Sequence, residues 1–376
     1  MPRETIEDRT TRDCAMYLPA GQLPVIEGLP EILRMNDGTS VRSRRDWARR
    51  RREIEAMMLH YQYGRMPPRP VSFIARETSS RPAYDGAATE KHITLRMGPE
   101  RGVSVRLRMV IPAGEGPFPV ILRNDRDLGT TAIAEEIIRR GYILAEYNRH
   151  DVDPDGPDRN DGVHPFYLGF DWGTLAAWAW GGMRVVDYLL TLDVVDGGKI
   201  AFTGHSRGGK AALLAGALDE RIALVSPNGS GTGGAGSYRI QGKGAETLKD
   251  ILKNFPYWFV PRLAGFVGRE NRMPFDQHFL RALVAPRAVL STDALGDQWA
   301  NPLGTQYMFV AAQPVFDWLG VGGNNAIHFR QGGHAQGPDD LRALLDFADR
   351  VFFRKTPESG RRFDLLPFPQ ERGESG

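Results

Sequence analysis

The sequence of 376 residues has little cysteine and no long apolar run. Its single cysteine, Cys14, excludes a disulfide within the chain, lies in a polar segment and is expected to be an incidental thiol. The fold therefore does not depend on an oxidising compartment. No stretch approaches the ~18 consecutive apolar residues of a membrane span, and the first residues lack the apolar core of a secretory signal. These absences predict a cytoplasmic protein without membrane association, or a secreted or periplasmic one if a leader was removed.

An excess of charge of either sign is also missing. The chain has 48 Lys and Arg against 46 Asp and Glu, a formal net charge of +2 at pH 7. Such a balance gives no general attraction to nucleic acids or anionic lipids, so a partner must be recognised at a shaped site. The composition, 41% hydrophobic and 25% charged, is that of a globular protein long enough to bury a large core. It leaves the number of subunits open.

The first 70 residues read as an extension that wraps the remainder of the protein. Extended, proline-punctuated sequence is followed by a basic segment at 42–63 whose apolar residues recur at helical spacing. Prolines at 67, 68 and 70 end this helix. We therefore divide the chain into an N-terminal extension, 1–70, and a main domain, 71–376, which we expect to fold together as one unit.

From residue 71 onward, strand patterns come first and then alternate with helix patterns. An antiparallel start is expected at 71–75, 92–97 and 103–112. Further strands are expected at 119–124, 143–148, 200–203, 222–226, 288–292 and 326–329. Helices are expected at 132–140, 174–192, 210–218, 277–284, 305–319 and 341–353. This alternation predicts an α/β fold, with a mostly parallel central sheet, an antiparallel N-terminal edge and helices on both faces.

The sharpest motif is Gly204-His205-Ser206-Arg207-Gly208, between an expected strand and a helix rich in small residues. In this setting Gly-x-Ser-x-Gly predicts the nucleophile elbow of an α/β-hydrolase, with Ser206 in a strained conformation at the turn. The following helix N-terminus favours negative charge there, and the backbone N–H of Arg207 is one expected oxyanion donor. Only the serine occupies the apex, so we expect His205 to point away from the site.

A serine hydroxyl needs a base, and in this fold an acid and then a histidine follow it in the chain. His334 is the expected base, because it lies in a glycine-rich segment between the last strand and the last helix. Both Asp293 and Asp297 follow the penultimate strand and can supply the acid. Asp293 at the strand end can instead cap the turn, so we favour Asp297, which would orient the imidazole.

Longer segments resemble the bacterial branch of the glucuronoyl esterases, carbohydrate esterase family 15. The similar segments are TGHSRGGK and its continuation (203–234), DWGTLAAWAWG (171–181), NFPYWF (254–259), PFDQH (274–278), GDQWANPLG (296–304), GGHAQ (332–336) and YQYGRMPPRP (61–70). They span nearly the whole chain, and Gly-x-Ser-Arg-x-Gly-Lys is more specific than the pentapeptide. The resemblance implies an α/β-hydrolase that cleaves esters of 4-O-methyl-glucuronic acid between xylan and lignin, without a metal or organic cofactor.

The resemblance also implies roles for further residues. The guanidinium of Arg207 would join its N–H in stabilising the oxyanion. Lys210 matches a lysine that contacts sugar hydroxyls, and Glu246 resembles a glutamate that contacts the sugar. Trp299 resembles an aromatic residue that packs on the uronate ring. By position alone, Lys210 is simply a first-turn helix residue, and Trp299 is equally a core aromatic.

Two features depart from the family pattern. Many members carry a catalytic glutamate in a Pro-Gln-Glu-Ser-Gly run, which here has Gly229 at the glutamate position. The acid must come from elsewhere, and other bacterial members use an aspartate that matches Asp297. Esters between lignin and carbohydrate are also extracellular, whereas this sequence predicts a cytoplasmic protein. The alternatives are an acetyl or general carboxylesterase acting on a small imported ester, and a non-catalytic carbohydrate-binding protein with this fold.

The segment Asp151-Val152-Asp153-Pro154-Asp155-Gly156 copies the opening of a calcium-binding loop. Its twelfth position is Gly162 in place of a bidentate glutamate, and Pro154 stiffens the turn. We therefore expect no metal site here. The loop should instead shape the mouth of the site at the carboxyl edge of the sheet, where ligands of such folds bind.

Overall fold

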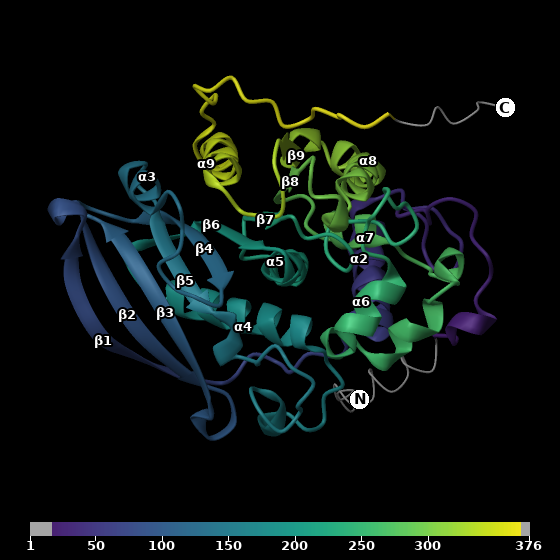
Figure 1. The fold of residues 1–376 in the computed structure, drawn as a ribbon, viewed down its shortest axis with the longest axis horizontal. Coiled ribbons are helices and arrows are strands. Elements are labelled where there is room, and N and C mark those ends of the chain that lie inside the picture. Colours follow the sequence, from purple (N-terminus) through teal and green to yellow (C-terminus); the bar gives the residue numbers. More distant parts are fainter. Residues whose placement is uncertain (1–16, 370–376) are drawn as a thin grey trace.

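The computed structural model describes residues 17–369, so Cys14 lies outside the described residues. Its centre is a nine-stranded sheet with the order β1-β2-β3-β5-β4-β6-β7-β8-β9 (Figure 1). The first three pairs in this order are antiparallel and the remaining five are parallel. The strands are β1 Phe73–Ala83, β2 Ala88–Met97, β3 Val103–Pro112, β4 Phe118–Asp125, β5 Ile143–Asn148, β6 Val195–His205, β7 Leu224–Asn228, β8 Ala288–Ala294 and β9 Asn325–Arg330.

Helices cover both faces of the parallel part of the sheet. They are α2 Arg44–Met58, α3 Ala134–Arg139, α4 Thr174–Leu189, α5 Arg207–Leu218, α6 Leu248–Asn254, α7 Gln277–Ala282, α8 Pro302–Trp318 and α9 Pro338–Phe353. In Figure 1, α3 and α9 lie on one side of the sheet, and α4 and α5 lie on the other. Successive side chains of a strand point to opposite faces, so Ile121 and Leu122 of β4 lie in two different apolar clusters. Parallel strands covered in this way carry continuous apolar runs.

The α/β-hydrolase prediction is confirmed, and most predicted elements lie within a few residues of the observed ones. The largest difference is β1, predicted at 71–75 and observed at Phe73–Ala83. Nearly all of its side chains are exposed on both faces. The strand therefore lacks the alternation of apolar and polar residues from which a strand is predicted. The short helix α6 was not predicted either; it has only seven residues and follows a glycine-rich stretch.

The N-terminal segment contributes to the main core. Trp47, Ile54 and Met57 of α2 belong to the same apolar cluster as Phe202 in the centre of the sheet. The helix begins with a side-chain cap, in which Ser43 Oγ accepts a hydrogen bond from the N–H of Asp46. The division of the chain at residue 70 stays a prediction, since one continuous cluster joins both sides of it.

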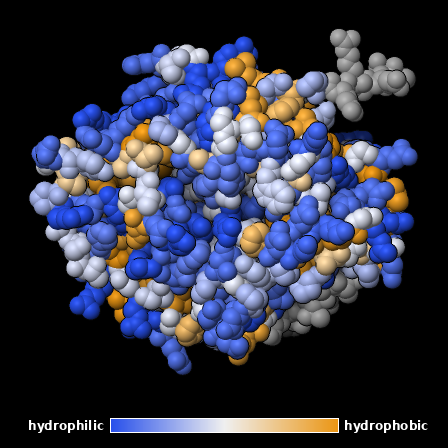
Figure 2. Space-filling view, in the orientation of Figure 1, coloured by the Kyte–Doolittle hydropathy of each residue, from blue (hydrophilic) through white to orange (hydrophobic). Residues whose placement is uncertain are grey.

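The outer surface is mostly polar on the face shown in Figure 2, where apolar side chains gather only in small separate groups. Among residues 17–369, the helices are too short or too polar to cross a membrane.

Candidate active site

The serine of the Gly-x-Ser-x-Gly motif stands at a strained turn between β6 and α5. Ser206 has φ 55° and ψ −121°, a backbone conformation that a non-glycine residue rarely adopts. A Cβ on Gly204 would lie 2.5 Å from the carbonyl carbon of Gly208, and one on Gly208 would lie 2.4 Å from Asn124 Oδ1. Both glycines are therefore required for the close approach of strand and helix. The turn leaves Ser206 at the positive end of the α5 dipole.

The loops after β8 and β9 bring an aspartate and a histidine together. His334 Nδ1 lies 2.5 Å from Asp297 Oδ2, and Asp297 is buried whereas His334 is exposed. The second carboxyl oxygen of Asp297 accepts a hydrogen bond from the N–H of Ala300, which holds the loop. When Nδ1–H donates to the carboxylate, Nε2 is left to accept a proton. This is the arrangement that a general base requires.

The other candidate acid, Asp293, lies elsewhere. It is the penultimate residue of β8 and is buried, and neither of its carboxyl oxygens has a hydrogen-bond partner within residues 17–369. Burial, reinforced by the charge of Asp340, raises the pKa of Asp293 well above its ordinary value. The structure therefore brings Asp297, and not Asp293, to the histidine. The suggestion that Asp293 caps a turn finds no matching hydrogen bond either.

The expectation that His205 points away from the site is wrong. Its ring centroid lies 4.4 Å from that of His334, and its Nδ1 lies 2.7 Å from Asn228 Oδ1. Because β6 continues to His205 and pairs it with Asn228 of β7, the ring lies beside the histidine-bearing loop. Burial, with a smaller contribution from His334, lowers the pKa of His205 to about 4. This ring is therefore neutral near pH 7.

Gly229, which stands where many family members carry the catalytic glutamate, lies beside the same pair. A Cβ at this position would lie 3.5 Å from Asp297 Oδ2 and 3.6 Å from His334 Nδ1. Its φ of +48° is in the left-handed region, which glycine adopts without strain. The two possible acid positions therefore converge on one histidine from different loops.

Arg207, the first residue of α5, turns its guanidinium toward an aromatic wall. The guanidinium carbon lies 5.2 Å from the ring centroid of Phe255 and 5.0 Å from that of Trp258, within the range of cation–π attraction. Its Nη1 donates to the carboxylate of Asp155. Sequence reasoning missed Asp155 as a site residue, because its motif was read as a failed calcium loop.

Lys210, one helical turn after Arg207 in α5, forms a buried pair with Glu246. Lys210 Nζ donates to the carbonyl oxygens of Ser230 and Thr232, both at 2.6 Å, and lies 3.9 Å from Glu246 Oε2. Burial lowers the pKa of Lys210 to about 8, and burial raises the pKa of Glu246. The lysine is therefore not an ordinary solvent-exposed residue of a first helical turn.

Trp299 is joined to this pair through the backbone. Its carbonyl oxygen accepts a hydrogen bond from the N–H of Glu246 at 3.0 Å. Its side chain is 50% exposed, so the reading of Trp299 as a core aromatic is wrong. An exposed indole beside a buried charged pair offers an apolar ring face to a bound molecule.

The three aspartates of the calcium-like motif diverge. Their partners are Arg106 for Asp151, His164 for Asp153 and Arg207 for Asp155. No cluster of three or more His, Cys, Asp or Glu suited to a metal ion occurs among residues 17–369. The acidic loop therefore makes two arginine ion pairs and one histidine contact, and the ion pair of Asp155 reaches the elbow.

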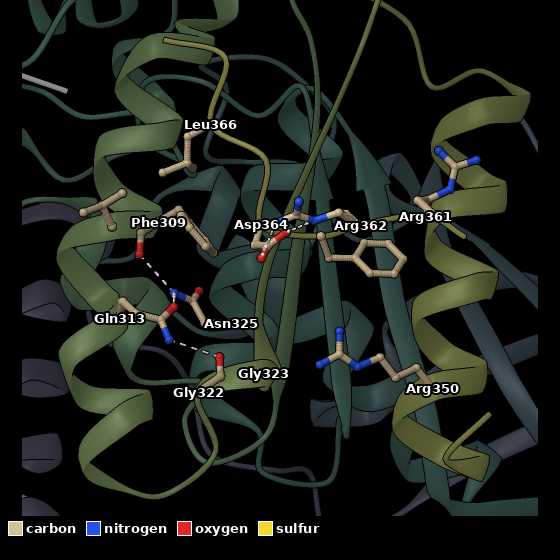
Figure 3. A pocket seen from close by; sticks show the side chains of 12 residues that line it. Phe309, Gln313, Gly322, Gly323, Asn325, Arg350, Arg361, Arg362, Asp364 and Leu366 are labelled. Atoms are coloured by element: carbon tan, nitrogen blue, oxygen red, sulfur yellow. Dashed lines mark hydrogen bonds and ion pairs between the residues drawn. The ribbon is translucent and has the colours of Figure 1, made fainter. Parts of the chain in front are cut away.

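A cavity of about 610 Å³ lies apart from these residues, between α8, α9 and the segment that follows α9 (Figure 3). Arg350, Arg361 and Arg362 line it together with Asp364, and no predicted site residue contributes to its lining. Arg361 pairs with Asp339 and Arg362 with Asp364, so two of its three cations are already neutralised. The carboxyl edge of the sheet is the candidate active site.

Known proteins resemble this chain over most of its length. Residues 97–320 match the sequence model of the fungal glucuronyl esterase family. A carbohydrate esterase from an unknown prokaryotic organism is 32% identical, over 85% of this chain and 89% of its own length. A 4-O-methyl-glucuronoyl methylesterase of Podospora anserina is 31% identical, over 86% of this chain and 68% of its own.

Solved structures show the same relationship. A glucuronoyl esterase of carbohydrate esterase family 15 from Caldicellulosiruptor kristjansonii superposes with a TM-score of 0.78 at 30% identity, covering 93% of this chain and 97% of its own. The fold, the elbow and the matched length point to one family. The chain belongs to carbohydrate esterase family 15, the glucuronoyl esterases, and is a carboxylic ester hydrolase with the α/β-hydrolase fold.

Proposed function

We propose that the protein hydrolyses esters of glucuronic or 4-O-methyl-glucuronic acid, with Ser206, His334 and Asp297 as its catalytic triad. The observation that carries this proposal is the 2.5 Å contact between His334 and Asp297 beside the strained Ser206 turn. Relatives named as 4-O-methyl-glucuronoyl methylesterases support the choice of ester.

The reaction is an acyl transfer in two stages. His334 Nε2 takes the hydroxyl proton of Ser206 as Oγ attacks the ester carbonyl carbon, and Asp297 stabilises the imidazolium that forms. The tetrahedral intermediate then collapses, the bond to the alcohol breaks, and His334 returns the proton to the leaving oxygen. A water activated by His334 attacks the acyl-enzyme in the same way and releases the uronic acid and free Ser206.

The oxyanion of both intermediates would be stabilised from the first turn of α5. The backbone N–H of Arg207 points from the helix N-terminus, and its guanidinium adds a full positive charge. Such charges act more strongly in a site from which water is excluded than in bulk solvent.

Recognition of the sugar is assigned to residues around Lys210, one helical turn after Arg207 in α5. Lys210 and Glu246 carry the polar groups for sugar hydroxyls, and the exposed ring of Trp299 provides a face for the pyranose. The burial of Lys210 and Glu246 limits competition from water. The substrate is accordingly a small-molecule or carbohydrate ester, and neither nucleic acid nor membrane is a proposed partner. The cytoplasmic location and the number of subunits stay predictions.

The direct test replaces Ser206 with alanine and measures hydrolysis of methyl and benzyl glucuronate. We expect kcat to fall by about 10⁴-fold or more, as removal of a triad nucleophile does. A fluorophosphonate probe should label the wild-type serine and leave the S206A variant unlabelled. A folded S206A variant with the wild-type rate contradicts the proposal, and a wild-type protein that resists the probe favours a non-catalytic binding protein.

The second candidate is an acetyl or general carboxylesterase, which the absence of the usual family acid at Gly229 favours. It is separated by comparing kcat/KM for glucuronate esters with that for acetyl esters, in the wild type and in Lys210→Ala. A uronate esterase should prefer glucuronate esters and lose that preference in the variant. An acetylesterase should show neither effect.

A further inference from the structure

The last aspartate of the calcium-like motif is built into the active site. Asp155 Oδ2 accepts a hydrogen bond from Arg207 Nη1, and its Oδ1 accepts from Tyr257 Oη at 3.0 Å and Trp258 Nε1 at 2.8 Å. The Asp155 side chain is 9% exposed. Both carboxyl oxygens are therefore occupied by donors that leave Asp155 little freedom to move.

The guanidinium of Arg207 is confined from a second direction. The rings of Phe255 and Trp258 stack with their centroids 4.0 Å apart and an interplanar angle of 5°. The guanidinium carbon of Arg207 lies about equally far from both ring centroids, at 5.2 Å and 5.0 Å. A guanidinium has five N–H donors in one plane, so a carboxylate on Nη1 fixes that plane and leaves other donors available.

The charge on Asp155 is maintained although the group is enclosed. Burial by itself would raise the pKa of this carboxyl, but the hydrogen bond from Trp258 and the positive charge of Arg207 outweigh it and lower the pKa. Asp155 is therefore ionised at neutral pH. Within residues 17–369, no other carboxylate forms an ion pair with Arg207.

We propose that Asp155 is a positioning residue that holds the Arg207 guanidinium in place for the oxyanion, an inference that rests on the proposed function. The Arg207 side chain is 33% exposed, and an arginine in that environment otherwise populates many rotamers. Stabilisation of an oxyanion is greatest when the charge is already placed before the reaction begins. The ring stack and Asp155 supply that placement from two separate loops, neither of which contributes a group to the triad.

The same loop offers a matched control. Asp151 makes an equivalent ion pair with Arg106, at 2.7 Å, but the Arg106 side chain is 63% exposed and comes from β3. Asp151→Asn removes the same charge from the same loop and leaves the contacts of Arg207 intact.

The test measures kcat and KM for a glucuronate ester in Asp155→Asn and Asp151→Asn. We expect kcat of D155N to fall roughly 10- to 100-fold with KM within about twofold of the wild type, because the lost contact acts in the transition state. D151N should keep both constants. Asp155→Glu restores the charge and should recover part of the lost kcat, which a merely structural role for the side chain would not predict.

A double-mutant cycle shows whether Asp155 acts through Arg207. In an Arg207→Ala background, D155N should change kcat by less than about twofold, since the group that it positions is already gone. If D155N fails to fold, Tyr257→Phe removes one donor to the carboxylate without changing charge. It should lower kcat about two- to fivefold, again only when Arg207 is present.

The results separate this inference from the proposed function. Wild-type kcat in folded D155N, or additive losses in the double mutant, overturns the positioning role while the inactivity of S206A still supports the serine esterase. Full activity of S206A overturns the proposed function itself.

Discussion

His334 Nδ1 lies 2.5 Å from Asp297 Oδ2, while Asp293, four residues earlier in β8, is buried and neither of its carboxyl oxygens has a hydrogen-bond partner within residues 17–369. By sequence position alone, either aspartate could be the triad acid, but the structure places the two in opposite environments. One is an ionisable partner for an exposed imidazole, and the other is a carboxyl whose pKa burial raises well above its ordinary range.

The first prediction concerns these two aspartates. Asp297→Asn should lower kcat for a glucuronate ester by about 100- to 10,000-fold, because the amide cannot stabilise the imidazolium and permits the wrong tautomer. Asp293→Asn should leave kcat within about threefold, because among residues 17–369 its carboxyl has no hydrogen-bond partner that the amide would lose. Steady-state kinetics at pH 7 on both variants decides between them. The reverse ranking would assign the triad acid to Asp293.

The second prediction moves the acid to Gly229. A side chain there begins 3.6 Å from His334 Nδ1, so Gly229→Glu should recover at least about tenfold of the kcat lost in Asp297→Ala. The positive φ of Gly229 makes this substitution destabilising by about 1 kcal/mol, which thermal unfolding should register.

Gly229→Gln in the same Asp297→Ala background is the matched control for acid transfer. It has the same size and backbone strain but no charge, so kcat should stay at the level of the single variant. Equal recovery by glutamine and glutamate would show that filling the space, and not the carboxylate, restores the rate.

The parts of the fold and site that depend on residues close together in the sequence were predictable. The strand, turn and helix around Ser206 are signalled by glycine spacing, and the loop of His334 by its position between the last strand and the last helix. The alternation of buried strands and amphipathic helices likewise gave the architecture, since each element must bury its own apolar face.

Features that depend on distant residues could not be predicted in this way. Asp155 and Arg207 are 52 residues apart, and Lys210 is held by main-chain carbonyls that any sequence possesses. The long strand β1 has no buried face and therefore no pattern. The ring of His205 lies against His334 only because strand β6, which ends at His205, and the loop after β9 meet at the same edge of the sheet.

The third prediction is a pH dependence from Lys210. Two N–H groups of its ammonium are used by the carbonyls of Ser230 and Thr232, so only the third is available to a sugar hydroxyl. Burial lowers the pKa of Lys210 to about 8, so this third N–H and the charge are lost as pH rises through that value. KM for methyl glucuronate should therefore increase about three- to tenfold between pH 7 and 9.

The control for Lys210 is a small neutral ester such as 4-nitrophenyl acetate, whose KM should not change over the same range. Deprotonation of Lys210 cannot raise KM by unfolding the protein, because it changes the free energy of unfolding in the stabilising direction. The folded protein releases the Lys210 proton near pH 8 while the unfolded chain holds it to about 10.5, so this group makes folding more favourable as pH rises between the two. A constant KM for methyl glucuronate would remove Lys210 from sugar binding.

The fourth prediction concerns the loop that carries His334. The guanidinium of Arg330 donates to the carbonyl oxygens of Gly333 and Ala335, which flank the histidine, and pairs with buried Asp340 at 2.6 Å. Arg330→Lys keeps the charge opposite Asp340 but loses the fork that holds both carbonyls. We expect kcat to fall roughly 5- to 50-fold with little change in KM, because misplacement of the base affects proton transfer more than binding.

Arg342→Lys is the matched control for the Arg330 variant, because Arg342 pairs with Glu136 on the exposed side of α9 and should tolerate the change. A histidine loop that has become mobile should also expose the amides of residues 331–336 to faster hydrogen exchange in Arg330→Lys than in the wild type. Loss of kcat with unchanged exchange would place the effect of Arg330 outside the loop. Unchanged kcat with faster exchange would show that His334 needs no such anchor, since it then finds Asp297 and Ser206 from a mobile loop.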